Sequence, residues 1–430
     1  MRLRRIVLAF AVSQLGTLAL AQGNFSILYN FCSAHYCSDG ASPNAGVIQD
    51  PSGNLYGTTW DGGYDYGVAY KLDTAGNETV LYSFCSQRAC VDGENPLSPL
   101  TRDEAGDLYG TTQYGGTGVC DGYGCGTVFE IDTAGNETVL YSFTGGPDGC
   151  FPYQGLARDR FGNLYGTTVE CGSSGYGTIF KVDSAGNFTL LHSFAGKPSD
   201  GAYPGDFGHL VMGKSGDLYG VTKGGGSYDH GTLYKLSKSG TLTLLHDFAG
   251  GKKDGCVPRG SVVLDEAGSL YGTTWGCGSH FGSHFSGTIW KVSQNGKETI
   301  LHSFAGYPSD GCRPAAGVAR DAKGNMYGVT YYCGADRMGT LYKLSAKGKL
   351  TLLHSFAGSD GANPVGDVLL TGNGTLFAPP LTAATPTTSG RCGRTYPKQT
   401  IAVPLYARRR ASLMLKNRDC TYLSSLRGFE

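Results

Sequence analysis

The sequence predicts an all-β protein, a seven-bladed β-propeller of four-stranded blades, and three observations support this fold class. Glycine supplies 69 of the 430 residues, tyrosine supplies 27, and only 16% are charged, which is typical of many short strands joined by tight turns. No sustained 3.6-residue apolar period occurs, so we expect little helix. A unit of about 53 residues with four strand-like segments recurs along nearly the whole chain.

The first 21 residues have the pattern of a secretory signal peptide. Arg2, Arg4 and Arg5 precede an apolar run over residues 6–20, and Ala19-Leu20-Ala21 offers a cleavage site. That run is short for a membrane span, and no later run reaches spanning length. We therefore predict an exported protein without a membrane span, located in the periplasm, at the cell surface or outside the cell.

Four short segments define the repeated unit, and the first unit carries them at residues 46–50 (GVIQD), 55–59 (LYGTT), 68–73 (VAYKLD) and 79–84 (TVLYSF). We call them a, b, c and d and expect each to form a strand. The a–b and c–d joints read Asp/Ser-x-x-Gly, which is typical of tight hairpins. The d–a and b–c joints are longer and vary in length. In an antiparallel meander the two long joints share one end, here called the loop face, and the hairpins share the other, the hairpin face.

The chain begins with the last segment of a unit and ends with the first segments of another, which predicts that the two ends meet and close a ring. It starts with a d segment at residues 25–31 (FSILYNF) and ends with an a segment, a b segment and a damaged c segment. We expect the N-terminal strand to complete the last blade, because closure removes exposed sheet edges. A linear β-solenoid is the alternative. The predicted domains are a signal peptide (1–21), a propeller with a degenerate seventh blade (22–390) and a divergent basic tail (391–430).

The glycine inside LYGTT marks a close approach within each unit. Gly57 lies in the interior of a predicted strand, where glycine usually admits another backbone or a bulky side chain. We expect the adjacent blade to fill this space, so the motif is interpreted as structural.

The 14 cysteines predict disulfides, because the protein is expected to reach an oxidising compartment. Three pairs are each 21 residues apart and join a d–a joint to the following b–c joint, which the blade geometry places at the same end. Three further pairs are local to one joint. The pairing of Cys392 with Cys420 stays open. The six predicted bonds are Cys32–Cys37, Cys85–Cys90, Cys120–Cys125, Cys150–Cys171, Cys256–Cys277 and Cys312–Cys333.

These repeated words resemble the tandem repeat named for Gloeobacter and Verrucomicrobia, the GloVer repeat of exported "choice-of-anchor" bacterial proteins. The resemblance covers about residues 25–380 and rests on the run GNLYGTT…GG…GT-apolar-aromatic-K…AGN-T-LYSF…DG…P. It implies an exported protein that is attached to the bacterial envelope or released, and it implies no particular reaction. The tail after residue 390 leaves the pattern, as a divergent end or a frameshift would.

The net charge of the predicted mature chain limits the classes of binding partner. Residues 22–390 carry a formal net charge of about −10, which makes a nucleic-acid partner improbable. We expect a monomer without a cofactor. An aspartate before glycine recurs in every d–a joint and is interpreted as a turn residue, with calcium binding as the alternative. These residues are Asp39, Asp92, Asp148, Asp200, Asp254, Asp310 and Asp360.

The b–c joints are rich in aromatic residues, which on a cysteine-braced face suit stacking on sugars or docking of a protein. Packing of these rings against one another is the competing interpretation. The candidate binding residues are Trp60, Tyr64, Tyr66, Tyr114, Trp275, Tyr331 and Tyr332. We predict a binding or scaffolding module for a glycan or an extracellular protein.

The alternative is a polysaccharide lyase or hydrolase with its site at the mouth of the channel. Residues that occur once rather than in every unit are the candidates for such a site: Glu170, Asp229, His230, Asp336 and Arg337. An enzyme needs its acid, base and stabilising groups to converge. The sequence lacks the G-x-S-x-G and H-E-x-x-H motifs, so binding is favoured over catalysis.

Overall fold

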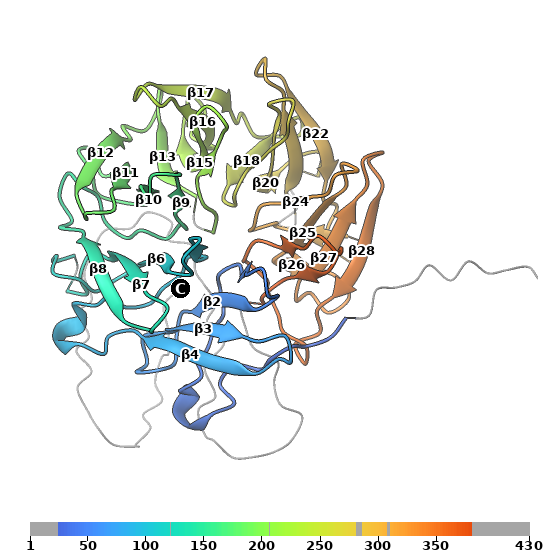
Figure 1. Ribbon diagram of the computed structural model, residues 1–430. Coiled ribbons are helices and arrows are strands. Elements are labelled where there is room, and N and C mark those ends of the chain that lie inside the picture. Colours follow the sequence, from blue (N-terminus) through green and yellow to red (C-terminus); the bar gives the residue numbers. More distant parts are fainter. Residues whose placement is uncertain (1–24, 121, 206, 281–285, 308–309, 381–430) are drawn as a thin grey trace, which may run out of the picture. The chain divides into compact units, whose positions relative to one another are not determined.

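The computed structural model describes residues 25–120, 122–205, 207–280, 286–307 and 310–380. These residues form an all-β propeller arrangement in which six antiparallel blades of four strands are arranged around a common centre (Figure 1). In each blade the strands run in sequence order from the centre to the periphery, so a is innermost and d is outermost. The signal-peptide prediction, the tail 391–430 and the cysteines 392 and 420 lie outside the described residues.

The first three blades repeat one pattern of a two-residue inner strand followed by strands of five, five and six residues. Blade one contains β1 (Ile48–Gln49), β2 (Leu55–Thr59), β3 (Val68–Leu72) and β4 (Glu78–Ser83). Blade two contains β5 (Thr101–Arg102), β6 (Leu108–Thr112), β7 (Thr127–Ile131) and β8 (Glu137–Ser142). Blade three contains β9 (Ala157–Arg158), β10 (Leu164–Thr168), β11 (Thr178–Val182) and β12 (Phe188–Ser193).

The next three blades follow the same order. Blade four contains β14 (Val211–Met212), β15 (Leu218–Gly225), β16 (Thr232–Leu236) and β17 (Leu242–Asp247). Blade five contains β19 (Val263–Leu264), β20 (Leu270–Cys277), β21 (Thr288–Val292) and β22 (Glu298–Ser303). Blade six contains β24 (Ala319–Arg320), β25 (Met326–Thr330), β27 (Thr340–Leu344) and β28 (Leu350–Ser355).

The long joints also contain short regular segments. β13 (Gly201–Pro204) pairs with β15, β18 (Gly255–Pro258) pairs with β20, and β23 (Gly311–Cys312) pairs with β26 (Tyr332–Cys333). Each of these pairs joins a d–a joint to the b–c joint of the same unit. Two single turns of 3-10 helix, η1 (His35–Cys37) and η2 (Arg88–Cys90), lie in the first two d–a joints. No helix among the described residues is both long and apolar enough to cross a bilayer.

The predicted seventh blade is not confirmed. After blade six the described residues contain only a two-stranded sheet, β29 (Leu369–Leu370) and β30 (Leu376–Phe377). Leu369 and Phe377 pack on the core of blade one, and Leu376 packs with Val329 and Leu341 of blade six. The two-stranded sheet therefore lies between these two blades.

Residues 25–31, the predicted outer strand of the last blade, are not assigned as a strand. Their aromatic rings nevertheless contact both ends of the six-blade array. Phe25 stacks on His354 of blade six with ring centroids 3.7 Å apart, and Phe31 lies 4.7 Å from Tyr70 of blade one.

Each blade is joined to the next by an aromatic pair. The phenylalanine that ends each d segment is buried, or partly buried in the case of Phe31, and its ring packs against the aromatic side chain in the c strand of the following blade. Ring centroids are 4.7 to 5.6 Å apart in six successive pairs. The pairs are Phe31–Tyr70, Phe84–Phe129, Phe143–Phe180, Phe194–Tyr234, Phe248–Trp290 and Phe304–Tyr342.

The glycine of LYGTT makes room for that same aromatic ring. Gly110 is paired across the sheet with Phe129, and a Cβ on Gly110 would lie 2.5 Å from the ring and 3.1 Å from Leu100. The expectation that the adjacent blade fills this space is wrong. The antiparallel register places the c-strand aromatic of the same blade over the glycine, and the adjacent blade packs on the far side of that ring.

The tyrosine of LYGTT stabilises the a–b hairpin. The Tyr56 hydroxyl donates to Oδ2 of Asp50 at 3.0 Å, while Oδ1 accepts backbone N–H bonds from Ser52 and Asn54, both at 2.9 Å. The same tyrosine–aspartate bond recurs in blades two, three, five and six, at 2.9 to 3.3 Å. The last threonine of the motif also has a structural role, since Oγ1 of Thr112 lies 2.8 Å from Oγ1 of Thr127. Four of the five residues in the motif therefore serve the fold: the buried leucine, the capping tyrosine, the glycine and the last threonine.

Replacing Gly110 by alanine tests the close approach. We expect a loss of about 1–3 kcal/mol in the free energy of unfolding, because the added methyl group collides with a buried ring that has no free volume to enter. Urea unfolding of the Gly110→Ala variant measures this loss. Gly372→Ala is the matched control, since a Cβ on Gly372 meets nothing within 4 Å. Equal effects of the two substitutions would contradict the packing role.

Candidate binding face and central channel

Six disulfides brace the loop face. The three predicted cross-joint bonds, Cys150–Cys171, Cys256–Cys277 and Cys312–Cys333, form in the structure with Cα atoms 5.4 to 5.5 Å apart. The local bonds Cys32–Cys37, Cys85–Cys90 and Cys120–Cys125 form as well. Each cross-joint bond lies where the d–a and b–c joints already pair as strands or as an isolated bridge. This number of disulfides indicates an oxidising, exported location.

The aspartates of the d–a joints anchor these joints to the outer strands. Oδ2 of Asp92 accepts bonds from the Tyr82 hydroxyl at 2.8 Å and from the Ser86 N–H at 2.8 Å. Histidine replaces tyrosine in the later units, and His302 Nε2 lies 2.9 Å from Oδ2 of Asp310. The carboxylates that the sequence offered to calcium are thus bonded to protein donors. The seven pairs are Tyr29–Asp39, Tyr82–Asp92, Tyr141–Asp148, His192–Asp200, His246–Asp254, His302–Asp310 and His354–Asp360.

A glutamate on the next outer strand approaches three of these aspartates, and the pairs are Glu78–Asp39, Glu137–Asp92 and Glu298–Asp254. Burial, with the nearby charge of Asp92, raises the pKa of Glu137 on β8 to about 8. Burial and Asp254 likewise raise the pKa of Glu298 on β22 to about 8. His246, Asp254 and Glu298 each place one potential metal-ligand atom within 4.8 Å of the others. These carboxyl pairs make the contact between neighbouring blades sensitive to pH.

Three of the predicted binding residues come together on the loop face. The Trp275 and Tyr331 rings lie 5.5 Å apart, and Tyr331 meets Tyr332 edge-on at 4.5 Å. The guanidinium groups of Arg259 and Arg313 lie over the Trp275 ring at 4.4 and 5.3 Å. Sequence reasoning missed these two arginines, each of which lies next to a proline in a d–a joint. Trp275 is therefore part of a packed aromatic–cationic cluster.

The other four predicted residues lie apart from this cluster. Trp60 donates through Nε1 to Oε1 of Gln113 at 3.3 Å, and Tyr114 packs edge-on against Phe151 at 5.4 Å. Tyr64 and Tyr66 in the first b–c joint are exposed. The seven candidates thus form one cluster, two packed rings and two exposed rings, rather than one continuous patch.

Exposed tyrosines gather on the loop face. Six of them, with 38% to 78% of their surface exposed, all lie in d–a or b–c joints: Tyr36, Tyr64, Tyr66, Tyr123, Tyr228 and Tyr307. The exposed aromatic residue of the hairpin face is Phe161, in the a–b hairpin of blade three. Of these six, sequence reasoning selected Tyr64 and Tyr66 as binding candidates and counted Tyr123 and Tyr228 among the aromatic residues of the b–c joints. It missed Tyr36 and Tyr307, which lie in d–a joints that also vary between units.

The candidates for catalysis make separate local contacts. Asp229 forms an ion pair with Lys197 at 3.1 Å, and His230 Nδ1 lies 3.1 Å from the carbonyl oxygen of Ala249. Arg337 lies 4.7 Å from the ring centroid of Tyr307. Glu170 exchanges backbone hydrogen bonds with Cys150, and Asp336 is exposed. These contacts hold individual joints in place.

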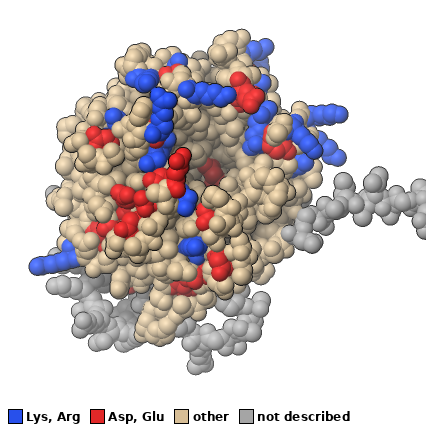
Figure 2. All heavy atoms as spheres, viewed as in Figure 1, with Lys and Arg blue, Asp and Glu red and all other residues tan. Residues whose placement is uncertain are grey.

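A cavity of about 580 Å³ occupies the centre, lined by the first strands β1, β5, β9, β14 and β29 and the residues just before them. Figure 2 shows the hollow, with acidic and basic side chains around it. Most of the residues that line it are apolar. His209 and Asp367 lie at the end of the cavity near the loop face, and Arg102 and Arg158 lie at the end near the hairpin face.

Three side chains from different units meet at this channel. Oγ of Ser261 lies 2.9 Å from Nδ1 of His209 and 2.5 Å from Oδ2 of Asp367. The His209 and Asp367 side chains line the cavity, and Nδ1 to Oδ2 is 3.8 Å. Sequence reasoning missed this cluster. The sequence nevertheless contains a pattern that could have identified these residues. Each of them lies four positions before the first residue of an a–b hairpin, where other units carry glycine or proline.

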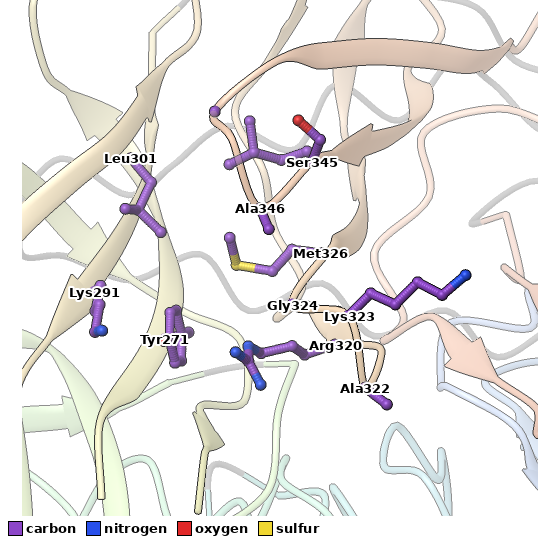
Figure 3. Close-up of a pocket in the computed structure, with 12 residues that line it drawn as sticks. Tyr271, Lys291, Leu301, Arg320, Ala322, Lys323, Gly324, Met326, Ser345 and Ala346 are labelled. Atoms are coloured by element: carbon purple, nitrogen blue, oxygen red, sulfur yellow. The ribbon is translucent and has the colours of Figure 1, made fainter. Parts of the chain in front are cut away.

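A second cavity, of about 340 Å³, lies between blades five and six on the hairpin face (Figure 3). Tyr271 projects into it between Lys291 and Arg320, whose charged groups lie 5.4 and 5.1 Å from the ring centroid. Arg158 over Tyr109 and Lys343 over Tyr327, both at 5.4 Å, repeat this contact elsewhere. The pocket is therefore a feature of the blade interface rather than a site of its own.

Comparison with known proteins identifies the repeat. A family model described as the Gloeobacter/Verrucomicrobia repeat matches residues 13–210 and 205–383. No curated protein matches the chain.

Several solved structures are similar to this chain at low identity. A putative 6-phosphogluconolactonase from Bacteroides fragilis NCTC 9343 is 14% identical, with a TM-score of 0.45 over 78% of this chain and 86% of that one. A functionally unknown protein from Desulfotomaculum acetoxidans DSM 771 is 13% identical, with a TM-score of 0.45 over 78% and 88%. A luciferin-regenerating enzyme is 13% identical, with a TM-score of 0.40 over 68% and 84%. These likenesses carry no inference about activity.

Removing a cross-joint disulfide should weaken the fold. In the chain-entropy model, the Cys256→Ser/Cys277→Ser variant loses about 3 kcal/mol in the free energy of unfolding, because the bond closes about 22 residues. Cys120→Ser/Cys125→Ser is the matched comparison and should lose about 2 kcal/mol, because its loop is shorter. Guanidinium unfolding of the oxidised proteins measures both. A larger loss in the short-loop variant would contradict this account.

The raised pKa of Glu137 predicts a pH dependence of stability. Between pH 4.5, the usual pKa, and about 8, the folded state holds a proton that the unfolded state releases. The free energy of unfolding therefore falls as pH rises through this window. Urea unfolding at pH 5 and pH 8 should show a smaller fall in Glu137→Gln than in the unsubstituted protein, whereas Glu104→Gln, at an exposed site, should change nothing. An equal fall in all three proteins would refute the assignment.

Proposed function

The chain belongs to the Gloeobacter/Verrucomicrobia repeat family, and from this premise we propose that it is an exported binding or scaffolding module that recognises a glycan through its loop face. The observation that carries the proposal is the set of six exposed tyrosines, all in the joints of one face. Exposing such rings to water gains nothing for folding, whereas a phenol ring offers both an apolar face and a hydroxyl to a ligand.

The scaffold under these rings suits recognition. The d–a joints are held by disulfides and by the tyrosine– or histidine–aspartate bonds, so the loop face is ordered before a ligand arrives. A pre-ordered face loses less conformational entropy on binding. Tyrosine also has few rotatable bonds, so its immobilisation costs little.

The proposal also includes the seventh unit, the start of the mature chain and the oligomeric state. Residues 25–31 take the outer-strand position of a seventh unit, beside β29 and β30, and the functional protein is a monomer that begins near Gln22. The contacts of Phe25 with blade six and of Phe31 with blade one support this placement. An extracellular protein is the second partner that an exposed tyrosine face would suit.

A lyase or hydrolase acting at the channel mouth is the weaker alternative. Four of the five residues proposed for it make separate contacts, with Lys197, Ala249, Tyr307 and Cys150, and the fifth, Asp336, is exposed. Acid, base and stabilising groups for one reaction would have to converge on one substrate atom. The binding proposal needs no such convergence.

Retention on immobilised polysaccharides tests the proposal. We expect the oxidised protein to be retained by at least one polysaccharide of a panel without new chain ends appearing. Tyr123→Ser should weaken retention about fivefold, because it loses ring stacking of about 1 kcal/mol. Tyr64→Ser/Tyr66→Ser removes two rings and should weaken retention about thirtyfold.

Phe161→Ser is the matched control, because it removes an exposed ring from the hairpin face. It should leave retention unchanged. Release of new chain ends would replace binding by catalysis as the function. Loss of retention in the Phe161 variant alone would place the ligand on the opposite face.

A further inference from the structure

The aspartate of each d–a joint, with its tyrosine or histidine partner, faces one residue of the next outer segment. That residue lies six positions before the phenylalanine that ends each d segment. The Tyr141 and Phe188 rings stack with centroids 4.4 Å apart, and the His354 and Phe25 rings stack at 3.7 Å. Around the array the facing residue is phenylalanine twice, leucine twice and glutamate three times: Phe25, Phe188, Leu242, Leu350, Glu78, Glu137 and Glu298. Since phenylalanine and leucine also serve here, packing of the blades does not require glutamate.

Only one of the seven contacts combines a histidine, an aspartate and a glutamate in its sequence. Glu78 and Glu137 approach aspartates whose partners are tyrosines, and the other histidines face leucine or phenylalanine. At the contact between blades four and five, Glu298 on β22 approaches Asp254, whose partner is His246 on β17. One potential ligand atom of each side chain lies within 4.8 Å of the other two. Two independent changes in the repeat therefore meet at this contact alone.

The spacing of His246 and Asp254 differs from that of the equivalent pairs. Nε2 of His246 lies 3.4 Å from both Oδ1 and Oδ2 of Asp254, which is longer than a usual hydrogen bond. In the other three histidine–aspartate pairs the shortest such distance is 2.7 to 3.0 Å. Two atoms bound to one tetrahedral zinc ion, each about 2.0–2.1 Å from it, are about 3.3 Å apart. The wider spacing therefore suits a shared ion better than a direct hydrogen bond.

Both carboxyl groups have oxygen lone pairs left for an ion. Oδ1 and Oδ2 of Asp254 accept one backbone N–H each, from Gly255 and Ala249, both at 2.6 Å. These bonds orient the carboxylate and leave a second lone pair on each oxygen. Oε1 of Glu298 is buried, and within the described residues it has no hydrogen-bond partner. A divalent cation between the two carboxyl groups would satisfy this oxygen and offset their mutual repulsion.

We propose that His246, Asp254 and Glu298 bind a zinc ion, which links the outer strand of blade four to the outer strand of blade five. One imidazole nitrogen and two carboxylate oxygens form a ligand set that zinc accepts, whereas calcium prefers oxygen ligands alone. Three protein ligands leave a fourth coordination position for water. The His246 and Asp254 side chains are 17% and 12% exposed, so the site is largely enclosed yet open to an entering ion. This site is independent of the loop-face tyrosines and of the proposed function that rests on them.

Equilibrium dialysis of the full oxidised protein against zinc chloride, followed by metal analysis, tests the proposal. We expect the unsubstituted protein to bind one zinc ion per chain more than Glu298→Leu or His246→Tyr. Both variants should fold, because leucine faces His192 and His302 in other units and tyrosine stands opposite the other two glutamates. Zinc should also raise the unfolding temperature of the unsubstituted protein and not that of the two variants, since the ligands converge only in the folded state.

Tyr64→Ser/Tyr66→Ser should leave zinc binding unchanged. That result would separate the zinc site from the loop face on which the proposed function rests.

A gain of binding provides the reciprocal test. Tyr82→His places an imidazole beside Asp92 and Glu137, so this variant should bind one zinc ion more than the unsubstituted protein. Tyr141→His is the matched control and should add none, because Tyr141 faces Phe188 instead of a glutamate. Equal zinc content in these two variants overturns the proposal. Equal zinc content in the unsubstituted protein, Glu298→Leu and His246→Tyr overturns it as well.

Discussion

The architecture depends on one packing contact, the burial of a c-strand aromatic ring between a glycine of its own blade and a phenylalanine of the preceding blade. Phe129 shows both sides of this contact, with Gly110 under the ring and Phe84 4.9 Å away. The glycine sets how deeply the ring lies in its sheet, and the phenylalanine sets the spacing to the next sheet. Successive blades are thus held by side chains of very similar size, which explains why the repeated words vary so little at these positions.

Much of the fold could be predicted from the sequence, because its determinants are local and repeated. Asp-x-x-Gly hairpins and the cysteines 21 residues apart involve residues that lie near one another in the chain. The partner of Gly57 could not be predicted with the same reasoning, because the register of β2 against β3 decides which side chain covers it. The blade count also exceeded what the described residues contain, since the third strand of the last unit would fall after residue 380.

The candidate site divides in the same way. The loop face could be predicted because cysteines and aromatics concentrate in particular joints. The His209, Ser261 and Asp367 cluster joins residues 52 and 106 positions apart in sequence. Only the arrangement of the inner strands around one axis brings these side chains together. Aligning the units with one another shows that these three residues differ from the glycine or proline of the other units. Their contact with one another depends on how the blades are arranged and cannot be read from that alignment.

The contacts of residues 25–31 have a consequence for the order in which the protein is made. This segment contacts blade one through Phe31 and blade six through Phe25, so its partners are separated by nearly the whole length of the repeat array. A chain synthesised and exported from its N-terminus presents these apolar residues first and receives their last partner only after His354 has emerged. Until then Phe25 lacks the ring on which it stacks, and it can be captured by a chaperone or by another chain. The N-terminal segment is therefore the last part of the chain to complete its packing.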